Sequence, residues 1–187
     1  MVTISMLWLP ILLSAIFVWI ASAIVWMALP HHKSDYKGLP DEETARQALL
    51  PQNLSPGQYN IPHLYSREDI KKPKVKKKFE DGPAGFITIV PKGIPRMGKG
   101  LGLTFIFYLI IGIFIAYLTS RTLTSGAPYL AVFRISGAVA WLAYGTGVVQ
   151  DAIWFGRPWS SVFKHLFDAL IYALLTAGTF GWLWPDA

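Results

Sequence analysis

The chain has 187 residues, of which 53% are hydrophobic and only 15% charged, and its formal net charge is +6. Soluble domains carry about 25% charged residues, so this composition excludes an ordinary soluble domain. The sequence contains no cysteine, which excludes disulfides, thiolate metal sites and cysteine nucleophiles.

The first of the apolar blocks covers residues 5–29 and contains no charged residue. Trp8 and Trp26 lie near its ends, where membrane-spanning helices place aromatic side chains. The preceding MVTIS carries no Lys or Arg, and no small-residue cleavage pattern follows a short apolar core. We therefore predict an uncleaved membrane span rather than a signal peptide.

His31 and His32 follow this span directly. Adjacent residues point about 100° apart on a helix and to opposite faces on a strand, so two neighbouring imidazoles are not expected to share one metal ion. Further ligands, such as Asp35, His63 or His165, would have to come from elsewhere in the fold. We interpret the pair as the point where the first span leaves the membrane, with proton transfer as the open alternative, and expect no metal and no cofactor.

Residues 30–100 form a basic loop region, which holds thirteen of the seventeen Lys and Arg residues. The sequence PDEETARQALL predicts a short helix capped by Asp41, and FITIV at 86–90 predicts a short strand. Residues 51–65 are rich in Pro, Gly and Asn, which indicates an extended loop. The region has too few apolar residues for a core of its own, so we expect it to lie against the membrane surface or a partner.

The densest charge run, KKPKVKKK, belongs to this loop. Anionic lipid headgroups are the nearest polyanion to a segment tethered beside a bilayer, and each lysine near such a surface contributes on the order of 1 kcal/mol. The alternative is a solvated run that only fixes topology. We expect no nucleic-acid partner, and we assign the lipid contact to Lys71, Lys72, Lys74, Lys76, Lys77 and Lys78.

Three more apolar blocks complete the chain, at about residues 101–120, 129–149 and 165–184. The predicted fold is therefore all-α and integral to the membrane, with four transmembrane helices in one bundle and a mostly irregular loop between the first two. Residues 1–187 then form a single membrane domain with a loop region at 30–100. Positive charge flanks the loop side of the spans, so we predict both termini outside and the loop in the cytoplasm.

The fourth span carries two stripes of residues. Small residues that recur every fourth position let another helix approach closely, and they are Ala169, Ala173, Ala177 and Gly181. A polar series runs beside them and consists of His165, Asp168, Tyr172, Thr176 and Thr179. Such a series indicates either a packing seam held by interhelical hydrogen bonds or a hydrated pathway, and we favour the seam.

Two groups of ionisable or aromatic residues are further candidates. An interfacial ionisable cluster is predicted at the cytoplasmic end, where Asp168 has Lys164 and His165 one turn away; its members are His31, His32, Arg157, Lys164, His165 and Asp168. Arg134 lies about 8 Å inside the third span by helix rise. Snorkelling to the interface is the simpler interpretation. An anionic ligand or pathway is the alternative, lined by Arg134, Trp141, Tyr144, Tyr172, Thr176 and Thr179.

No motif for a serine hydrolase, zinc protease, nucleotide-binding loop or redox dithiol is present. We therefore predict a non-catalytic multi-pass membrane protein that is an accessory, scaffold or assembly subunit of a larger membrane complex. Its expected partners are the lipid bilayer and other membrane subunits or further copies of itself. The alternative is a small oligomeric transporter or channel for a proton, ion or small anionic solute, and the third hypothesis is a lipid-modifying membrane enzyme.

Overall fold

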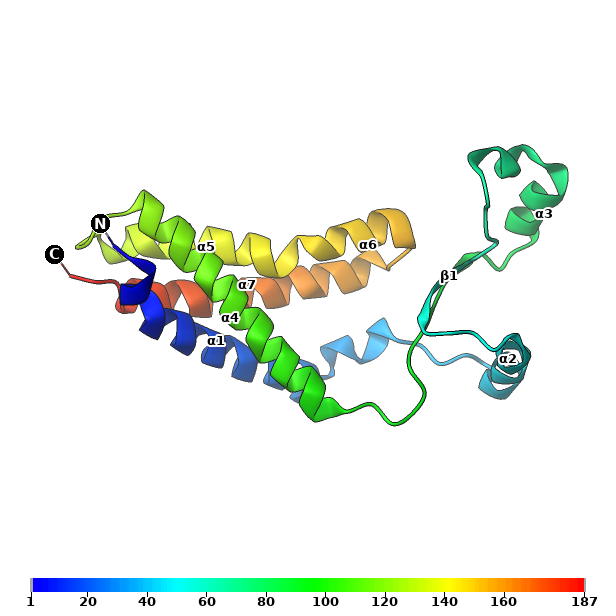
Figure 1. The fold of residues 1–187 in the computed structure, drawn as a ribbon, viewed down its shortest axis with the longest axis horizontal. Coiled ribbons are helices and arrows are strands. Elements are labelled where there is room, and N and C mark those ends of the chain that lie inside the picture. Colours follow the sequence, from blue (N-terminus) through cyan, green and yellow to red (C-terminus); the bar gives the residue numbers. More distant parts are fainter. Residues whose placement is uncertain (1, 187) are drawn as a thin grey trace. The chain divides into compact units, whose positions relative to one another are not determined.

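The structure, a computed structural model, describes residues 2–186 and is mostly helical (Figure 1). It divides into two compact units. The bundle unit consists of Met1–Tyr36 with Arg96–Ala187, and the loop unit consists of Lys37–Pro95. The expected single membrane domain thus has a separate compact unit inserted between its first and second long helices.

Three helical stretches of the described residues are long and apolar enough to cross a membrane: Ile4–Ala28, Met97–Thr122 and Tyr129–Phe155. This supports the predicted membrane class. The elements of the bundle unit are η1 (Ile4–Leu7), α1 (Trp8–Ala23), η2 (Ile24–Ala28), η3 (Pro30–Asp35), α4 (Met97–Thr122), α5 (Tyr129–Gly145), α6 (Gly147–Phe155) and α7 (Trp159–Trp182).

Helix α7 covers the predicted fourth span but differs from the other three. It is 24 residues long and begins at Trp159, six residues before the expected start. It is not among the three stretches that meet the hydropathy requirement. Lys164, His165 and Asp168 lie in its first half, and these polar residues lower its mean hydropathy. Its composition therefore does not establish that α7 spans the membrane, and a fourth span is a proposal.

The four long helices form a ring in which α1 contacts α4 and α7, and α5 contacts α4 and α7. The α5–α7 pair is the closest. A Cβ added at Gly145 would lie 2.9 Å from the Cβ of Ala169, and one at Gly137 would lie 3.1 Å from that of Ala177. The stripe of small residues predicted on the fourth span therefore faces α5, where it allows the two backbones to approach closely.

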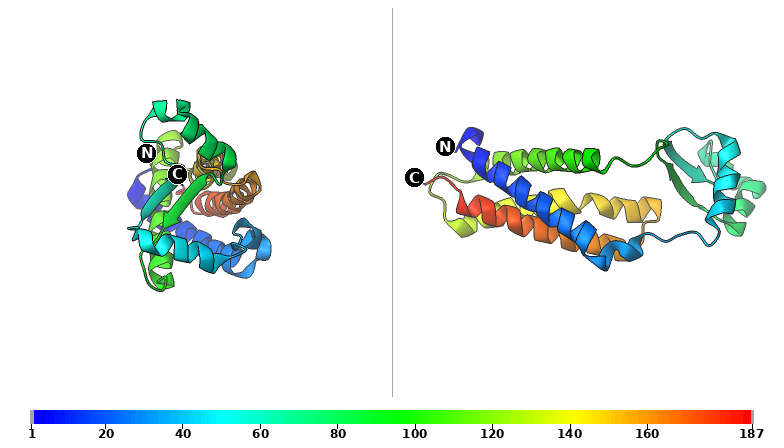
Figure 2. Two further views of the ribbon diagram at one scale, coloured as in Figure 1. Left: turned by 90° about the vertical axis from the view of Figure 1, so that its right-hand side faces the viewer. Right: turned by 90° about the horizontal axis from the view of Figure 1, so that it is seen from below.

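The core of the bundle is built from one apolar cluster near the chain ends and a second around Tyr108 and Tyr172. Val2 and Trp184 share the first cluster with Leu7, which brings the two ends of the chain to the same end of the bundle (Figure 2). The indole N–H of Trp184 donates to the carbonyl of Thr124 at 3.0 Å. This bond fastens the chain after α7 to the loop that follows α4.

The loop unit contains α2 (Glu42–Leu49), η4 (Leu50–Gln52), β1 (Gly57–Ile61), η5 (Arg67–Lys71), α3 (Pro73–Asp81) and β2 (Gly85–Ile89). Helix α2 coincides with the predicted helix, and the Asp41 carboxylate accepts from the Thr44 N–H at 3.0 Å. Strand β2 coincides with the strand expected at 86–90. It pairs antiparallel with β1 in a two-stranded sheet, in a register from Gly57↔Ile89 to Ile61↔Gly85.

The structure corrects two expectations for this region. Residues 51–65 were expected to be extended loop, but they include β1, because β2 supplies backbone partners that local sequence does not reveal. The sequence of the lysine run predicts no helix, but residues 73–78 of the run lie in α3. Pro73 stands at the first turn of that helix, where a missing N–H costs nothing. The region is therefore not mostly irregular, and the chain is not purely α-helical.

Candidate functional site

The first span ends in a way that turns two histidines back toward the bundle. Helix α1 continues into the wider turn η2, and Leu29 then has an extended backbone with φ −86° and ψ 141°. Pro30 opens the 3-10 turn η3, in which residues three apart lie on the same side. This places His32 beside Asp35, and the His32 Nδ1 lies 2.7 Å from a carboxylate oxygen of Asp35.

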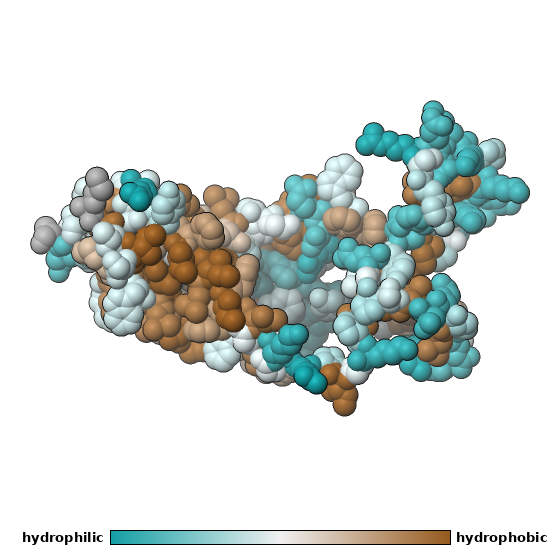
Figure 3. Space-filling model, viewed as in Figure 1, coloured by the Kyte–Doolittle hydropathy of each residue, from teal (hydrophilic) through white to brown (hydrophobic). Residues whose placement is uncertain are grey.

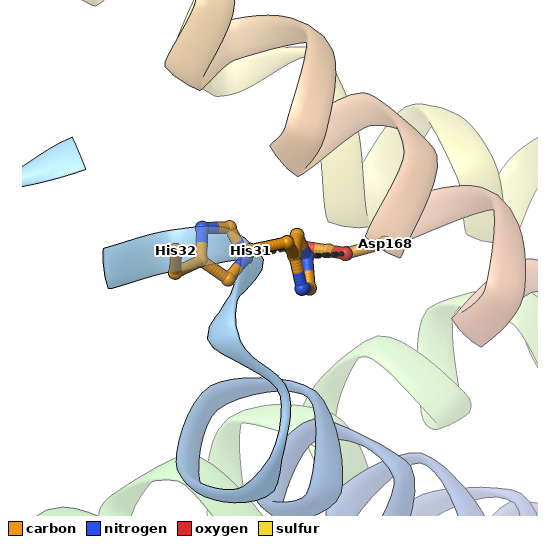
Figure 4. A group of neighbouring side chains, drawn as sticks. All are labelled: His31, His32 and Asp168. Atoms are coloured by element: carbon orange, nitrogen blue, oxygen red, sulfur yellow. Dashed lines mark hydrogen bonds and ion pairs between the residues drawn. The ribbon is translucent and has the colours of Figure 1, made fainter. Parts of the chain in front are cut away.

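Both histidines reach one carboxylate of α7 (Figure 4). The Nε2 of His31 lies 3.1 Å from Oδ1 of Asp168, and the Nε2 of His32 lies 2.6 Å from Oδ2. The Asp168 side chain is only 3% exposed. The expectation that the two neighbouring imidazoles do not converge is wrong here, since their ring centroids lie 4.1 Å apart and both rings reach one carboxylate.

Lys164 joins η3 to α7 from the other side of Asp35. Its ammonium donates to the Asp35 carboxylate and to the Ser34 hydroxyl, each at 2.7 Å, and also to the His31 carbonyl. Burial acts to raise the pKa of Asp35, but hydrogen bonds from His32 and Lys164 outweigh it and lower that pKa to about 2. We call the set His31, His32, Asp35, Lys164 and Asp168 the histidine–aspartate cluster.

Arg157 belongs to the edge of the cluster and does not pair with Asp168. Its guanidinium donates to Asp151 and to the Ser161 hydroxyl, each at 3.3 Å. It also lies 2.6 Å from Nε2 of His165. Since a guanidinium can only donate, His165 accepts at Nε2 and is a neutral imidazole with its proton on Nδ1.

An indole covers the buried histidine. The ring of Trp26 stacks on that of His32, with centroids 3.9 Å apart and an interplanar angle of 3°. The same indole lies 5.2 Å from the His165 ring. The indole of Trp26 thus covers one face of the buried His32 ring.

His32 has more acceptors than a neutral histidine can satisfy. Its two ring nitrogens lie 2.7 Å and 2.6 Å from carboxylate oxygens of Asp35 and Asp168. A neutral imidazole has one N–H, so one of these contacts would set a nitrogen lone pair against a carboxylate oxygen. Either a second proton or a metal ion is therefore required between His32 and its two carboxylate neighbours.

The structure thus brings together the six residues of the interfacial ionisable cluster, although the individual pairs differ from those expected. Sequence reasoning passed over three participants: Trp26, Asp151 and, as a cluster member, Asp35. The i,i+3 spacing of His32 and Asp35 was a usable signal, because a tight turn after Pro30 places these two side chains together.

The residues proposed for a ligand or pathway do not form one site. Thr176 and Thr179 are buried, and their hydroxyls donate to carbonyls of their own helix, those of Tyr172 and Leu175. Tyr144 packs edge-on against Tyr172, with ring centroids 6.0 Å apart. These four residues line the bundle interior.

The other two members of that group face outward. Arg134 is exposed on α5, and within residues 2–186 no hydrogen bond or ion pair to its guanidinium is seen. Trp141 is partly exposed, and its indole N–H donates to the Leu166 carbonyl at 3.3 Å. This separation favours the snorkelling interpretation of Arg134.

In the loop unit, the lysine run is solvent-exposed. Lys72 pairs with Asp69 at 2.6 Å, and Lys76 lies 3.8 Å from Glu80. The remaining lysines of the run present their charges to solvent on and before α3.

Comparison of the chain with protein-family models, with curated proteins and with solved structures gives no match.

Proposed function

We propose that the protein is a non-catalytic accessory, scaffold or assembly subunit of a larger membrane complex, and that the loop unit binds the partner. The observation that carries the proposal is the loop unit's lack of a core. Among residues 37–95, Asp69 is the only buried residue. A unit of this size stays folded only if further apolar surface is covered.

The loop unit also exposes the apolar side chains that a core would need. Tyr65 is 90% exposed and Ile94 is 93% exposed. Leu39, Leu50, Ile70 and Val90 are exposed as well. Figure 3 shows hydrophobic residues among the hydrophilic ones on the surface of the loop unit. Such side chains outside a span indicate an interaction surface.

The two-stranded sheet favours a protein as the partner. Within the described part of the chain, β1 and β2 pair only with each other, so each has an outer edge of backbone N–H and C=O groups. An isolated two-strand ribbon is marginal in water. A strand from another chain can complete it through backbone hydrogen bonds, which lipid headgroups cannot reproduce in register.

Native mass spectrometry tests this proposal. The tagged full-length protein is extracted from its own membranes in mild detergent, and a heteromeric complex of defined stoichiometry is expected. Tyr65→Ser with Ile94→Ser should reduce the complex while the bundle stays folded, and Phe114→Ala, at an exposed position of α4, is the control. A wild-type chain that runs alone, or only with lipid, refutes the proposal.

A second function is supported by the convergence of His31, His32, His165 and Asp168 at one place, which is the constellation of the lipid-modifying hypothesis. His32 and His165 stand with ring centroids 5.2 Å apart. Lipid turnover by the purified protein is the test, and normal turnover by the His31→Ala, His32→Ala double variant excludes this site. The transport alternative stays a prediction without a comparable contact to support it.

We also infer four spans, with both termini outside and the loop unit in the cytoplasm. The support is the distribution of Lys and Arg and the length of α7. Because the chain has no cysteine, single substitutions report topology without background. A membrane-impermeant maleimide added to intact cells should label Thr124→Cys but not Glu80→Cys, and the reverse pattern would invert the topology.

A further inference from the structure

We infer that His31, His32 and Asp168 form a binding site for a divalent transition-metal ion of the zinc class, located where the first span meets α7. One ligand atom from each of these residues lies within 4.8 Å of the other two. The inference concerns the bundle unit and stands independently of the partner proposed for the loop unit.

The spacing of the donors suits such an ion. Metal–nitrogen and metal–oxygen bonds of about 2.0–2.2 Å place neighbouring ligand atoms roughly 3.3 Å apart in a tetrahedral site. The His31 Nε2 and Asp168 Oδ1 are already 3.1 Å apart. The His32 Nε2 stands 2.6 Å from the other carboxylate oxygen, Oδ2. Because one ligand atom from each residue lies within 4.8 Å of the other two, small side-chain shifts bring all three donors around one ion.

The ligand types select the class of ion. Two imidazoles with one carboxylate suit Zn²⁺ and its neighbours in the first transition series, whereas Mg²⁺ and Ca²⁺ prefer oxygen ligands alone. The absence of cysteine removes the thiolates that many closed structural zinc sites use.

Hydrogen bonding around His32 is what a metal-binding histidine requires. Its Nδ1 faces Asp35 at 2.7 Å, which fixes the proton there and leaves the Nε2 lone pair free for an ion. Asp35 is in turn held by the Lys164 ammonium at 2.7 Å. This ordered chain of Lys164, Asp35 and His32 orients the ligand before an ion arrives.

The nearby cationic side chains are engaged by other residues, so the negative charge of Asp168 is the one that a bound metal ion would neutralise. Lys164 compensates Asp35, and Arg157 is engaged by Asp151 and His165. A carboxylate that is almost fully buried is costly without a cation. A metal ion between the Nε2 atoms and Asp168 supplies that charge, and it also removes the lone-pair conflict at His32.

A second group, His32 with Asp35 and His165, has a similar spacing but is less suited. His165 already accepts at Nε2 from Arg157 and carries its proton on Nδ1, and Asp35 already accepts from Lys164. Binding an ion through His165 would break its contact with Arg157 or displace its Nδ1 proton. The ion therefore belongs to His31, His32 and Asp168.

Three protein ligands leave one coordination position open. The His31 side chain is 31% exposed, whereas that of Asp168 is 3% exposed, so the open position lies on the His31 side. Sites with three protein ligands and a water molecule are typical of zinc ions that act on a substrate, and closed four-ligand sites of those that only stabilise a fold.

The test is metal binding by the full-length protein, purified in mild detergent with an affinity tag that contains no histidine. After metal removal and addition of Zn²⁺, elemental analysis should find about one ion per chain. Co²⁺ should give the visible absorption of a four-coordinate site. His31→Ala and Asp168→Asn should each weaken binding at least tenfold, and Asp35→Asn by roughly 10–100-fold.

His63→Ala is the matched control, since His63 lies in the loop unit and contacts Asn60. It should bind metal as the wild type does. If Asp168→Asn or His31→Ala fails to fold, X-ray absorption of the zinc-loaded wild type gives the answer without a variant. It should show nitrogen and oxygen neighbours at about 2.0–2.2 Å with the scattering of two imidazoles.

Two results would overturn the inference. One is a wild-type chain that binds no more Zn²⁺ than the His31→Ala, Asp168→Asn double variant, which would mean that His32 is held by a proton alone. The other is a bound ion whose absorption spectrum contains no imidazole.

Discussion

Because α5 and α7 pack so closely, we expect that one methyl group added at Gly145 will force the two helices apart. Gly145 ends α5, and a Cβ at this position would stand 2.9 Å from the Cβ of Ala169. The nearest side-chain atom of Leu166 would lie at 3.2 Å. Neither Cβ can rotate away from the other, so Gly145→Ala must shift a backbone.

Gly147 provides the control that isolates this clash. Only Thr146 separates the two glycines, and it has right-handed helical angles of φ −71° and ψ −24°. Nothing lies within 4 Å of a Cβ added at Gly147. Alanine is favoured over glycine in a helix by about 0.8–1 kcal/mol, and this term acts on both variants. Their difference therefore reports the packing clash.

Overpacking of a well-filled interior costs about 1–3 kcal/mol. We expect Gly145→Ala to be less stable than Gly147→Ala by that amount. The measurement is the free energy of unfolding in mixed micelles during titration with a denaturing detergent, followed by tryptophan fluorescence. Equal stabilities for the two variants would refute the close α5–α7 contact.

Three further predictions concern single residues. Asp41→Ala should lower the stability of α2 through loss of its N-cap, seen as faster amide exchange at Thr44; unchanged exchange contradicts the cap. Hydrogen bonds from Lys72 and the Ser66 N–H lower the pKa of Asp69 from 3.8. The turn at Asp69 is thus stabilised above that pH and loses the contribution as pH falls below it, and a carboxyl NMR midpoint at or above 3.8 counts against this. Thr179→Val should cost less than about 1 kcal/mol, because the hydroxyl bonds only its own helix; a larger loss on detergent titration would indicate another partner.

Sequence reasoning succeeded where the signal is local. The uncharged run before Pro30, the Asp41 cap and the β-branched run at 86–90 each depend on neighbours in the chain, and the structure has the corresponding elements. The stripe of small residues on α7 was also readable, because helical periodicity alone places Ala169 and Ala173 on one face.

The features that were missed depend on distant partners or on irregular backbone. Strand β1 exists because β2 pairs with it, and Gly57 to Ile61 alone do not indicate a strand. His31 and His32 lie 137 and 136 positions before Asp168, and they meet it only because Leu29 and η3 redirect the chain.

The polarity of α7 bears on how the bundle is assembled. In the proposed four-span arrangement, α7 is the helix least able to enter lipid unaided, yet the bundle buries its polar residues Asp168, Thr176 and Thr179. It follows α1, α4 and α5 along the chain. If those three helices are already in the bilayer, α7 can bury its polar side chains against them as it enters. Its membrane insertion and its docking against α1, α4 and α5 then occur together. A substitution that weakens the packing of α1, α4 and α5 should then appear as failed translocation of the C-terminal end, before any loss of function is observed.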